Sequence, residues 1–361
     1  MTDKPPPASI KGRGAAHNPG NRFEAYERER DPQEGPADEG DMTAPRPRTV
    51  IMLQQARSII ARNDSPDVPF SQSINPYQGC EHGCIYCYAR PTHAYLGLSP
   101  GLDFETRLFG KQNAAELLRK ELARPGYKCE LIALGANTDP YQPVEREQRI
   151  TRAILEVLAG HHHPVGIVTK SALVERDIDI LAQMAKQNLV HVFVSITSLD
   201  AELSRKLEPR ATAPYRRLDA VRTLTGAGIP CGVLFAPVIP FINDKDLESV
   251  LEAAAGAGAS MAGYVVLRLP HEVKTLFRDW LARHFPLRAA RVMARVNDLR
   301  GGRDYDSDFD SRMSGKGEYS ALIASRFTRA CAKHGLFNGE RFTLDTSRFR
   351  VPGRGEQLNL L

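Results

Sequence analysis

The stretch over residues 74–90 reads INPYQGCEHGCIYCYAR and carries the most informative pattern in this 361-residue chain. It holds three of the six cysteines, Cys80, Cys84 and Cys87, within one short segment. Residues 71–76 are a predicted strand, so the cysteines lie on a loop at its carboxyl end. Ligands and catalytic groups of α/β proteins gather at that end of the strands. The stretch therefore predicts a metal site or a catalytic site.

Three clustered cysteines favour an iron–sulfur cluster over a zinc site. Proteins that use cubane clusters only as electron carriers supply four cysteines. Here no further cysteine falls in a matching motif, so three thiolates leave one iron without a protein ligand. An open position of this kind is what chemistry at a metal requires. The alternative is a structural zinc site, a non-catalytic module, with His82 or His93 as the fourth ligand; paired ligands from a second segment are absent.

The sequence around this stretch predicts alternating strands and helices. Short β-branched apolar runs predict strands, and amphipathic stretches between them predict helices. Such alternation implies βαβ units, a parallel sheet and right-handed crossovers. A partial (β/α)6 barrel and an open doubly wound sheet both fit. The predicted strands are residues 71–76, 130–135, 165–170, 190–197, 232–238 and 263–269, and the predicted helices between them are residues 114–123, 146–158, 175–187, 214–227 and 244–257.

Composition divides the chain into three parts. Residues 1–48 are rich in Pro, Gly and charged residues and bury too little apolar surface to offset the entropy of ordering, which predicts disorder. Residues 49–300 form the predicted α/β core. Residues 301–361 form a helical C-terminal extension, in which residues 317–334 are the predicted helix.

The Cys-x3-Cys-x2-Cys spacing, with Tyr86 before the third cysteine, resembles the signature of the radical S-adenosylmethionine (SAM) superfamily. The runs LGANTDPYQPVE, VTKS, VSIT, LEPRATAPYRRL and GIPCGVLFAPVIPFIND resemble the branch of spore photoproduct lyases and DNA repair photolyase-like proteins. The resemblance implies a radical SAM (β/α)6 partial TIM barrel, with a [4Fe–4S] cluster on Cys80, Cys84 and Cys87 and SAM at the fourth iron. It also implies an enzyme, of lyase or transferase type, in which reductive cleavage of SAM gives a 5′-deoxyadenosyl radical that abstracts hydrogen from a substrate.

The resemblance further assigns residues to SAM binding. The loop after the second strand takes the place of the segment that meets the SAM amino group, although a turn is an equal alternative for these residue types. A lysine at the end of the third strand matches one that meets the carboxylate. The implied cofactor-binding residues are Asn137, Thr138 and Asp139 in the loop, Lys170, Ser195 near the ribose, and Tyr86, Val238 and Leu267 near the adenine.

This chain differs from the photoproduct lyases at one position that matters for their reaction. Photoproduct lyases depend on a cysteine in the loop after the second strand, and this chain has Ala136 there. The resemblance therefore does not imply reversal of thymine dimers. Glu208 and Arg210, in the run LEPR, are candidates for an Arg–carboxylate fork that meets SAM or a substrate anion, with surface ion pairing as an equal alternative.

The net charge of +5 is unevenly distributed. From residue 267 onward there are 18 Lys and Arg residues against 11 Asp and Glu residues. A basic region attracts phosphate-bearing partners, so nucleic acid is a candidate substrate; a solvated arginine-rich helical face is an equal alternative. The family resemblance implies a reductant such as flavodoxin or ferredoxin. The arginines at partly helical spacing are Arg283, Arg288, Arg291, Arg295 and Arg300.

The composition is typical of a soluble globular protein, with 42% hydrophobic and 25% charged residues. No run of roughly 18 apolar residues predicts a membrane span. The amino terminus lacks the apolar region of a secretory signal. We therefore predict a cytoplasmic protein without a membrane partner.

Overall fold

The computed structural model describes residues 9–24, 47–338 and 343–352. Within these residues the main sheet has eight strands in the order β11-β10-β9-β8-β7-β6-β3-β2. Every neighbouring pair from β3 to β11 is parallel, and β2 is antiparallel to β3. The strands are β2 (Ile60–Arg62), β3 (Gln72–Ile74), β6 (Ile132–Leu134), β7 (Val165–Thr169), β8 (Val190–Ser195), β9 (Cys231–Val238), β10 (Met261–Val266) and β11 (Phe337–Asn338).

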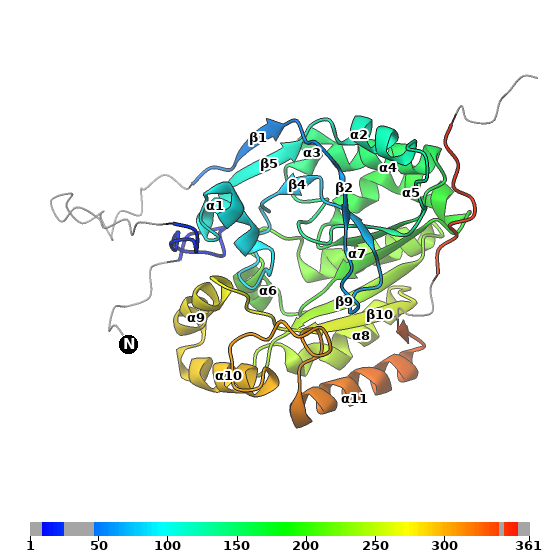
Figure 1. Ribbon diagram of the computed structural model, residues 1–361. Coiled ribbons are helices and arrows are strands. Elements are labelled where there is room, and N and C mark those ends of the chain that lie inside the picture. Colours follow the sequence, from blue (N-terminus) through cyan, green and yellow to red (C-terminus); the bar gives the residue numbers. More distant parts are fainter. Residues whose placement is uncertain (1–8, 25–46, 339–342, 353–361) are drawn as a thin grey trace, which may run out of the picture.

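Helices between successive strands cover one face of this curved sheet (Figure 1). The arrangement confirms the predicted α/β partial barrel and its six βα units from β3 to β10. The connecting helices are α2 (Ala114–Leu122), α4 (Ile150–Gly160), η2 (Ala172–Asp177), α5 (Ile178–Ala185), α6 (Ala201–Leu207), α7 (Pro214–Gly226), η3 (Asp244–Asp246) and α8 (Leu247–Gly256).

Alternation along the strands separates the helix-covered core from the interior of the barrel. In β8, Val190, Val192 and Val194 are buried in the main hydrophobic core with residues of the surrounding helices. Side chains alternate across a strand, so Phe193 and Ser195 lie on the opposite face. Ser195 thus faces the barrel interior at the carboxyl end of β8.

A small second sheet leads the chain into the cysteine stretch. Its strands are β1 (Val50–Gln54), β5 (Arg107–Lys111) and β4 (Tyr77–Gln78), with β5 in the middle. The sequence did not predict this sheet, because its strands are short and β5 (RLFGK) contains two charged residues and a glycine. The glycine, Gly110, leaves room for Leu53 and Ile150, whose methyl carbons lie 3.1 Å from the position a Cβ would take.

The predicted helix over residues 146–158 is confirmed as helical but is divided into two in the structure. The structure has α3 (Glu145–Gln148) and then α4, divided at Arg149, whose φ of 52° is left-handed. The carboxylate of Glu145 accepts hydrogen bonds from the backbone N–H of Thr151 at 3.0 Å and Arg152 at 3.4 Å. These bonds satisfy the amino-terminal donors of α4 and stabilise the break.

Residues 9–24 make defined contacts, in contrast to the disorder that their composition predicts. The backbone N–H groups of Gly14 and Ala15 donate to the Glu105 carboxylate at 3.0 and 2.8 Å. A Cβ on Gly14 would lie 1.8 Å from the carbonyl oxygen of Gly83, so only glycine fits there. Residues 1–8 and 25–46, which share the prediction, lie outside the described residues.

The helical C-terminal part contains α9 (Val273–His284), α10 (Pro286–Leu299) and α11 (Gly317–His334), the last as predicted. α11 packs on α8, where Arg326 and Glu248 form an ion pair at 2.6 Å. β11 continues the main sheet beside β10. Residues 301–338 therefore contact the barrel directly. The boundary at residue 300 between the core and the C-terminal extension stays a prediction. Residues 339–342 and 353–361 of that part lie outside the described residues.

The arginines at helical spacing do not form one solvated face. Arg291 lies over the Phe241 ring, 4.0 Å from its centroid, and Arg295 lies 5.1 Å from that of Tyr319. Arg300 is buried and donates to backbone carbonyls, including that of Leu267 at 2.6 Å. These arginines therefore pack against the protein itself, and Arg288 donates to the Phe241 carbonyl at 3.4 Å.

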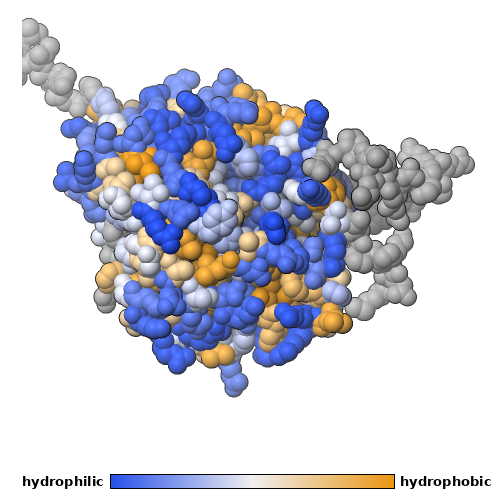
Figure 2. Space-filling view, turned by 180° about the vertical axis from the view of Figure 1, so that it is seen from behind, coloured by the Kyte–Doolittle hydropathy of each residue, from blue (hydrophilic) through white to orange (hydrophobic). Residues whose placement is uncertain are grey.

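Hydrophilic residues predominate on the face shown in Figure 2, and the hydrophobic residues visible there occur in small groups. Scattered apolar residues of this kind are ordinary on folded proteins. None of the helices in the described ranges has the length and apolar character needed to cross a bilayer.

Candidate active site

The cysteine loop begins directly after β4, at the carboxyl end of the parallel strands. The Cys80 N–H donates to the Phe104 carbonyl at 2.9 Å, which ties the loop to α1 (Leu102–Thr106). The Ile85 N–H donates to the Leu207 carbonyl at 3.1 Å, at the end of α6. Cys80 and Cys84 are buried, and Cys87 is half-buried. The loop is therefore anchored on two sides, and its cysteines lie next to the barrel interior.

Arg90 is the first residue of η1 (Arg90–Leu96). It is fully buried and hydrogen-bonds to the backbone of the cysteine loop. Its Nε donates to the carbonyl of Cys84 at 2.9 Å, and its Nη2 donates to that of Gly83 at 3.2 Å. The same Nη2 pairs with the buried Glu105 carboxylate at 2.5 Å. The Glu105 carboxylate also accepts the hydrogen bonds from the backbone of the N-terminal segment. One buried ion pair therefore links that segment, α1 and the cysteine loop.

The three thiols of the loop are free and close enough to affect one another electrostatically. Burial, followed by the charges of Asp139, Cys84 and Cys87, raises the pKa of Cys80. Burial and the Glu208 carboxylate raise the pKa of Cys84 to about 12, against the lowering effect of Lys170. A cationic metal centre bound at these thiols would reverse the burial effect and favour the thiolates.

A zinc site on this loop would use His82 or His93 as its fourth ligand. Within the described ranges, no three His, Cys, Asp or Glu side chains are arranged to hold a single metal ion. The two candidate fourth ligands have other contacts. The His82 Nδ1 lies 3.3 Å from Asp139, and the His93 Nε2 lies 2.9 Å from the Arg107 carbonyl.

Asp139 ties the loop after β6 to the neighbouring strand. Its carboxylate accepts from the Lys170 N–H and the Thr169 hydroxyl, each at 2.7 Å. Burial opposes ionisation, but the His82 imidazole and these hydrogen bonds outweigh it and lower the pKa of Asp139 to about 2. Thr138 donates to the Tyr77 carbonyl at 2.8 Å, and the Asn137 N–H donates to Asn75 at 2.9 Å. These side chains organise the loop, as the turn alternative expects.

Lys170 lies at the end of β7 beside the cysteine loop. Its Nζ is 6.0 Å from the centroid of the Tyr86 ring. Burial disfavours the ammonium, yet the charges of Cys84 and Glu208 outweigh burial and raise the pKa of Lys170. The lysine is therefore a cation held near the carboxylates of Glu208 and Asp139 at the barrel end.

Glu208 is the buried centre of a second network. It accepts hydrogen bonds from the Tyr86 hydroxyl, from the Arg217 guanidinium and, at 3.1 Å, from Thr197. Arg217 also donates to the Ser195 carbonyl at 2.8 Å. Glu208 and Arg210 therefore do not pair with each other. Arg217 is the partner of Glu208, and Arg210 pairs with Glu81 at 3.0 Å.

Three further candidates lie at the ends of neighbouring strands. The Ser195 hydroxyl is buried and has no hydrogen-bond partner within the described residues. The Leu267 N–H donates to the Val238 carbonyl at 3.0 Å, so these two residues close the sheet at the ends of β9 and β10. The structure therefore brings the candidate residues to one end of one barrel.

Sequence reasoning missed Arg90, Glu105 and Arg217. Arg217 carried a detectable signal, because in α7 it follows the spacing of the buried positions Pro214, Val221 and Leu224. A charged residue on an apolar helical face predicts a buried partner. Arg90 and Glu105 lie in short helices without such periodicity, and we find no sequence signal for them.

The comparison with protein families identifies the class of this barrel and its cysteine loop. The sequence model of the radical SAM superfamily matches residues 74–254, which include the cysteine loop and the strands from β3 to β9. The chain belongs to this superfamily and is an enzyme of it. Membership implies SAM and a [4Fe–4S] cluster as cofactors.

Similar proteins include an uncharacterised protein of Mycobacterium tuberculosis, 40% identical over 64% of this chain and 68% of its own length. An uncharacterised protein of Methanocaldococcus jannaschii is 28% identical over 48% of this chain and 62% of its own length. Among solved structures, spore photoproduct lyase complexed with dinucleoside spore photoproduct covers 80% of this chain and 81% of its own, with a TM-score of 0.56 and 15% identity. That likeness supports the fold, as the sequence resemblance predicts.

Proposed function

We propose that Cys80, Cys84 and Cys87 hold three irons of a [4Fe–4S] cluster and that SAM binds the fourth. The observation that carries this proposal is the set of three free thiols on one loop at the barrel end. When bound and reduced, such a cluster cleaves SAM to methionine and a 5′-deoxyadenosyl radical, which abstracts hydrogen from the substrate.

The chain's own residues fit SAM at this end of the barrel. The partnerless hydroxyl of Ser195 is a suitable group for the ribose, since a buried polar atom needs a partner. The ammonium of Lys170 suits the methionine carboxylate. Tyr86, Val238 and Leu267 are buried and suit the adenine. The loop of Asn137, Thr138 and Asp139 offers backbone carbonyls and a hydroxyl that suit the amino group of SAM, and Asp139 fixes that loop.

Anaerobic reconstitution with iron and sulfide tests the proposal. We expect a brown protein that converts SAM into 5′-deoxyadenosine when dithionite is added, measured by liquid chromatography. A colourless protein that binds one zinc tightly and forms no 5′-deoxyadenosine would contradict the proposal. Deuterium transfer from candidate substrates into 5′-deoxyadenosine would then identify the substrate.

Replacing Lys170 by glutamine should weaken SAM binding by roughly 10-fold to 100-fold, because a hydrogen bond to a charged group contributes about 1.5–3 kcal/mol. Equilibrium dialysis of the reconstituted protein measures this affinity. Lys186→Gln, at an exposed position after α5, removes the same charge and should leave SAM affinity unchanged. Equal affinities of the Lys170 and Lys186 variants would remove Lys170 from the SAM site.

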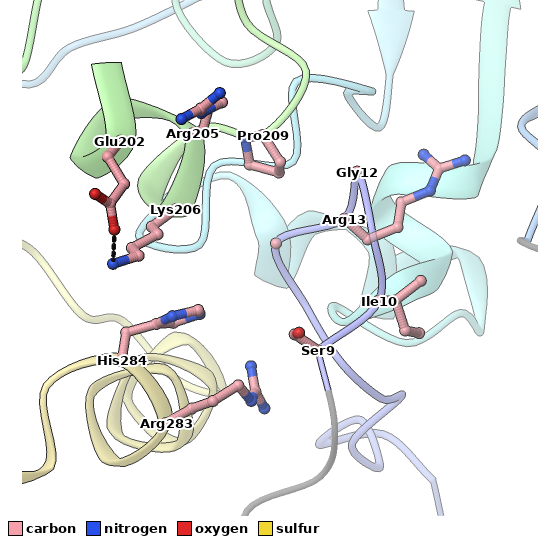
Figure 3. A pocket seen from close by; sticks show the side chains of 11 residues that line it. Ser9, Ile10, Gly12, Arg13, Glu202, Arg205, Lys206, Pro209, Arg283 and His284 are labelled. Atoms are coloured by element: carbon pink, nitrogen blue, oxygen red, sulfur yellow. Dashed lines mark hydrogen bonds and ion pairs between the residues drawn. The ribbon is translucent and has the colours of Figure 1, made fainter. Parts of the chain in front are cut away.

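A basic cavity of about 250 Å³ lies on the outer side of the cysteine loop, between α6, α9 and the N-terminal segment (Figure 3). Arg205 and Lys206 line it from α6, and Arg283 and His284 project from α9 toward the N-terminal segment. Glu202, the one carboxylate among the described lining residues, pairs with Lys206 at 2.7 Å. The cavity is therefore positively charged.

This cavity suits the docking of an acidic electron carrier such as flavodoxin or ferredoxin in the cytoplasm. Its lining residues Gly14 and Pro209 both approach Gly83, which lies between two of the cluster cysteines. An electron from a carrier seated there would have a short path to the cysteine loop. Complementary charge steers such partners and sets their association rate.

Replacing Arg205 by glutamate should weaken flavodoxin binding about tenfold at low ionic strength, and the difference should shrink as salt is added. Fluorescence anisotropy of labelled flavodoxin with the reconstituted protein measures both effects. Arg119→Glu changes the charge equally on the exposed side of α2 and should leave the affinity unchanged. If both variants bind flavodoxin like the wild type, the carrier docks elsewhere.

A further inference from the structure

The segment that ends α6 runs along the cysteine loop. The Ile85 N–H of the loop donates to the Leu207 carbonyl at 3.1 Å. Three residues further on, the Arg210 N–H donates to the His82 carbonyl of the loop at 3.2 Å. Glu208 lies between these two bonds in the sequence. Backbone hydrogen bonds therefore fix Glu208 beside the three cysteines, independently of its side chain.

The side chain of Glu208 is buried against the same loop, with only 1% of the residue exposed. Its carboxylate accepts a hydrogen bond from the hydroxyl of Tyr86, which lies in the sequence between Cys84 and Cys87. The Thr197 hydroxyl donates to the same carboxylate at 3.1 Å. The carboxylate is therefore held in one place next to the cysteine loop.

Glu208 is charged, and its charge acts on the cysteine loop. Burial opposes ionisation of Glu208, but the charges of Arg217 and Lys170 outweigh burial and lower its pKa. After burial, the Glu208 carboxylate is the largest influence that raises the pKa of Cys84. Lys170 and Arg217 each lower that pKa by less, and the effect of Arg217 is the smaller of the two. The carboxylate therefore acts more strongly on Cys84 than its own counter-ion does.

A fixed negative charge makes a nearby iron–sulfur cluster harder to reduce, because reduction adds one more negative charge. The charges around such a cluster are among the factors that set its reduction potential. Water screens the charge of Glu208 little, since the side chain is buried. Once the electron carrier has supplied its electron, a lower potential makes that electron a stronger reductant of the SAM sulfonium. A buried carboxylate beside Cys84 therefore has a consequence for the reaction.

We infer that Glu208 lowers the reduction potential of the [4Fe–4S] cluster through its buried negative charge. The inference rests on the proposed function, because it concerns the cluster bound at the cysteine loop. A structural role is the alternative, in which Glu208 acts only by its shape and its hydrogen bonds. The two roles predict different effects for a variant that keeps the shape and for a variant that keeps the charge.

Redox titration of the reconstituted full-length protein without SAM, followed by electron paramagnetic resonance, measures the potential. Glu208→Gln keeps the shape and removes the charge, so it should raise the ratio of reduced to oxidised cluster roughly tenfold at a fixed solution potential. For a one-electron couple this is a shift of about +59 mV. Glu208→Asp keeps the charge on a shorter side chain and should stay near the wild-type potential. Glu116→Gln, at an exposed position of α2, is the matched control and should not change the potential.

A double variant keeps the inference testable if the unpaired Arg217 destabilises Glu208→Gln. Glu208→Gln with Arg217→Met replaces the buried ion pair by uncharged side chains, an exchange that is often neutral or stabilising. Because Glu208 acts on Cys84 more strongly than Arg217 does, the potential of the double variant should lie above that of the wild type. It should also lie below that of Glu208→Gln.

The inference is overturned if Glu208→Gln and the double variant both retain their iron and titrate at the wild-type potential. It is equally overturned if Glu208→Asp shifts the potential as far as Glu208→Gln does, because shape and hydrogen bonds would then explain both variants. A wild type that takes up no cluster and forms no 5′-deoxyadenosine is a different result, since it contradicts the proposed function itself.

Discussion

Replacement of Arg90 by methionine is expected to lower the free energy of unfolding by about 3–5 kcal/mol, since it leaves the Glu105 carboxylate buried without its counter-ion. The change also removes the donors to the carbonyls of Gly83 and Cys84. We therefore expect reduced iron content as well as reduced stability. Urea unfolding of the reconstituted protein, followed by circular dichroism, and an iron assay measure the two effects.

A double variant separates the effect of the uncompensated charge on stability from the effect of the lost arginine side chain. Arg90→Met with Glu105→Gln removes the uncompensated charge, so it should unfold at a higher urea concentration than Arg90→Met alone. Arg119→Met, at an exposed position, should change the free energy of unfolding by less than about 0.5 kcal/mol. If Arg90→Met matches the Arg119 variant in stability and iron content, the buried pair does not support the cysteine loop.

Replacement of Cys84 by alanine is expected to reduce the iron content from about four atoms per chain to less than about one, and to abolish 5′-deoxyadenosine formation. The main hydrophobic core, which includes strands β6 to β9 and their helices, does not depend on this cysteine. The barrel should therefore remain folded, with a loss of about 1–2 kcal/mol from the missing buried sulfur. Circular dichroism and an iron assay on the same sample measure both properties.

Cys331→Ala is the matched control, because Cys331 in α11 is also buried and lies outside the cysteine loop. It should lose stability to a similar degree and keep its iron. A structural zinc module predicts the opposite for Cys84→Ala, since a structural metal contributes folding energy directly and its loss unfolds the protein. Unfolding of the Cys84 variant alone would therefore favour the zinc alternative.

The sequence predicted the main sheet well because its strands carry a strong and redundant pattern. β7 (VGIVT) and β8 (VHVFVS) are apolar runs between amphipathic helices, and βα alternation leaves few topologies to choose from. The cysteine loop was predicted equally well, because the spacing of its three cysteines is specific. In contrast, the helix break at Arg149 depends on hydrogen bonds to the Glu145 carboxylate. The local composition does not predict these hydrogen bonds.

Tertiary hydrogen bonds explain the other differences. Residues 9–24 are ordered by bonds from backbone N–H groups to Glu105, so their low apolar content was a poor guide. Glu208 pairs with Arg217, on the buried face of α7, although Arg210 lies closer to it in the sequence. The partners of a buried carboxylate are set by packing between distant elements, and sequence proximity is a weak guide to them.

The central claim is that three cysteines leave one iron open and that SAM fills this position. Electron–nuclear double resonance of the reduced, reconstituted protein tests it most directly, with SAM isotope-labelled at its amino nitrogen and carboxylate oxygens. We predict magnetic coupling of the cluster to both labels. Coupling to a nitrogen or oxygen of the protein instead, with none from labelled SAM, would contradict the account.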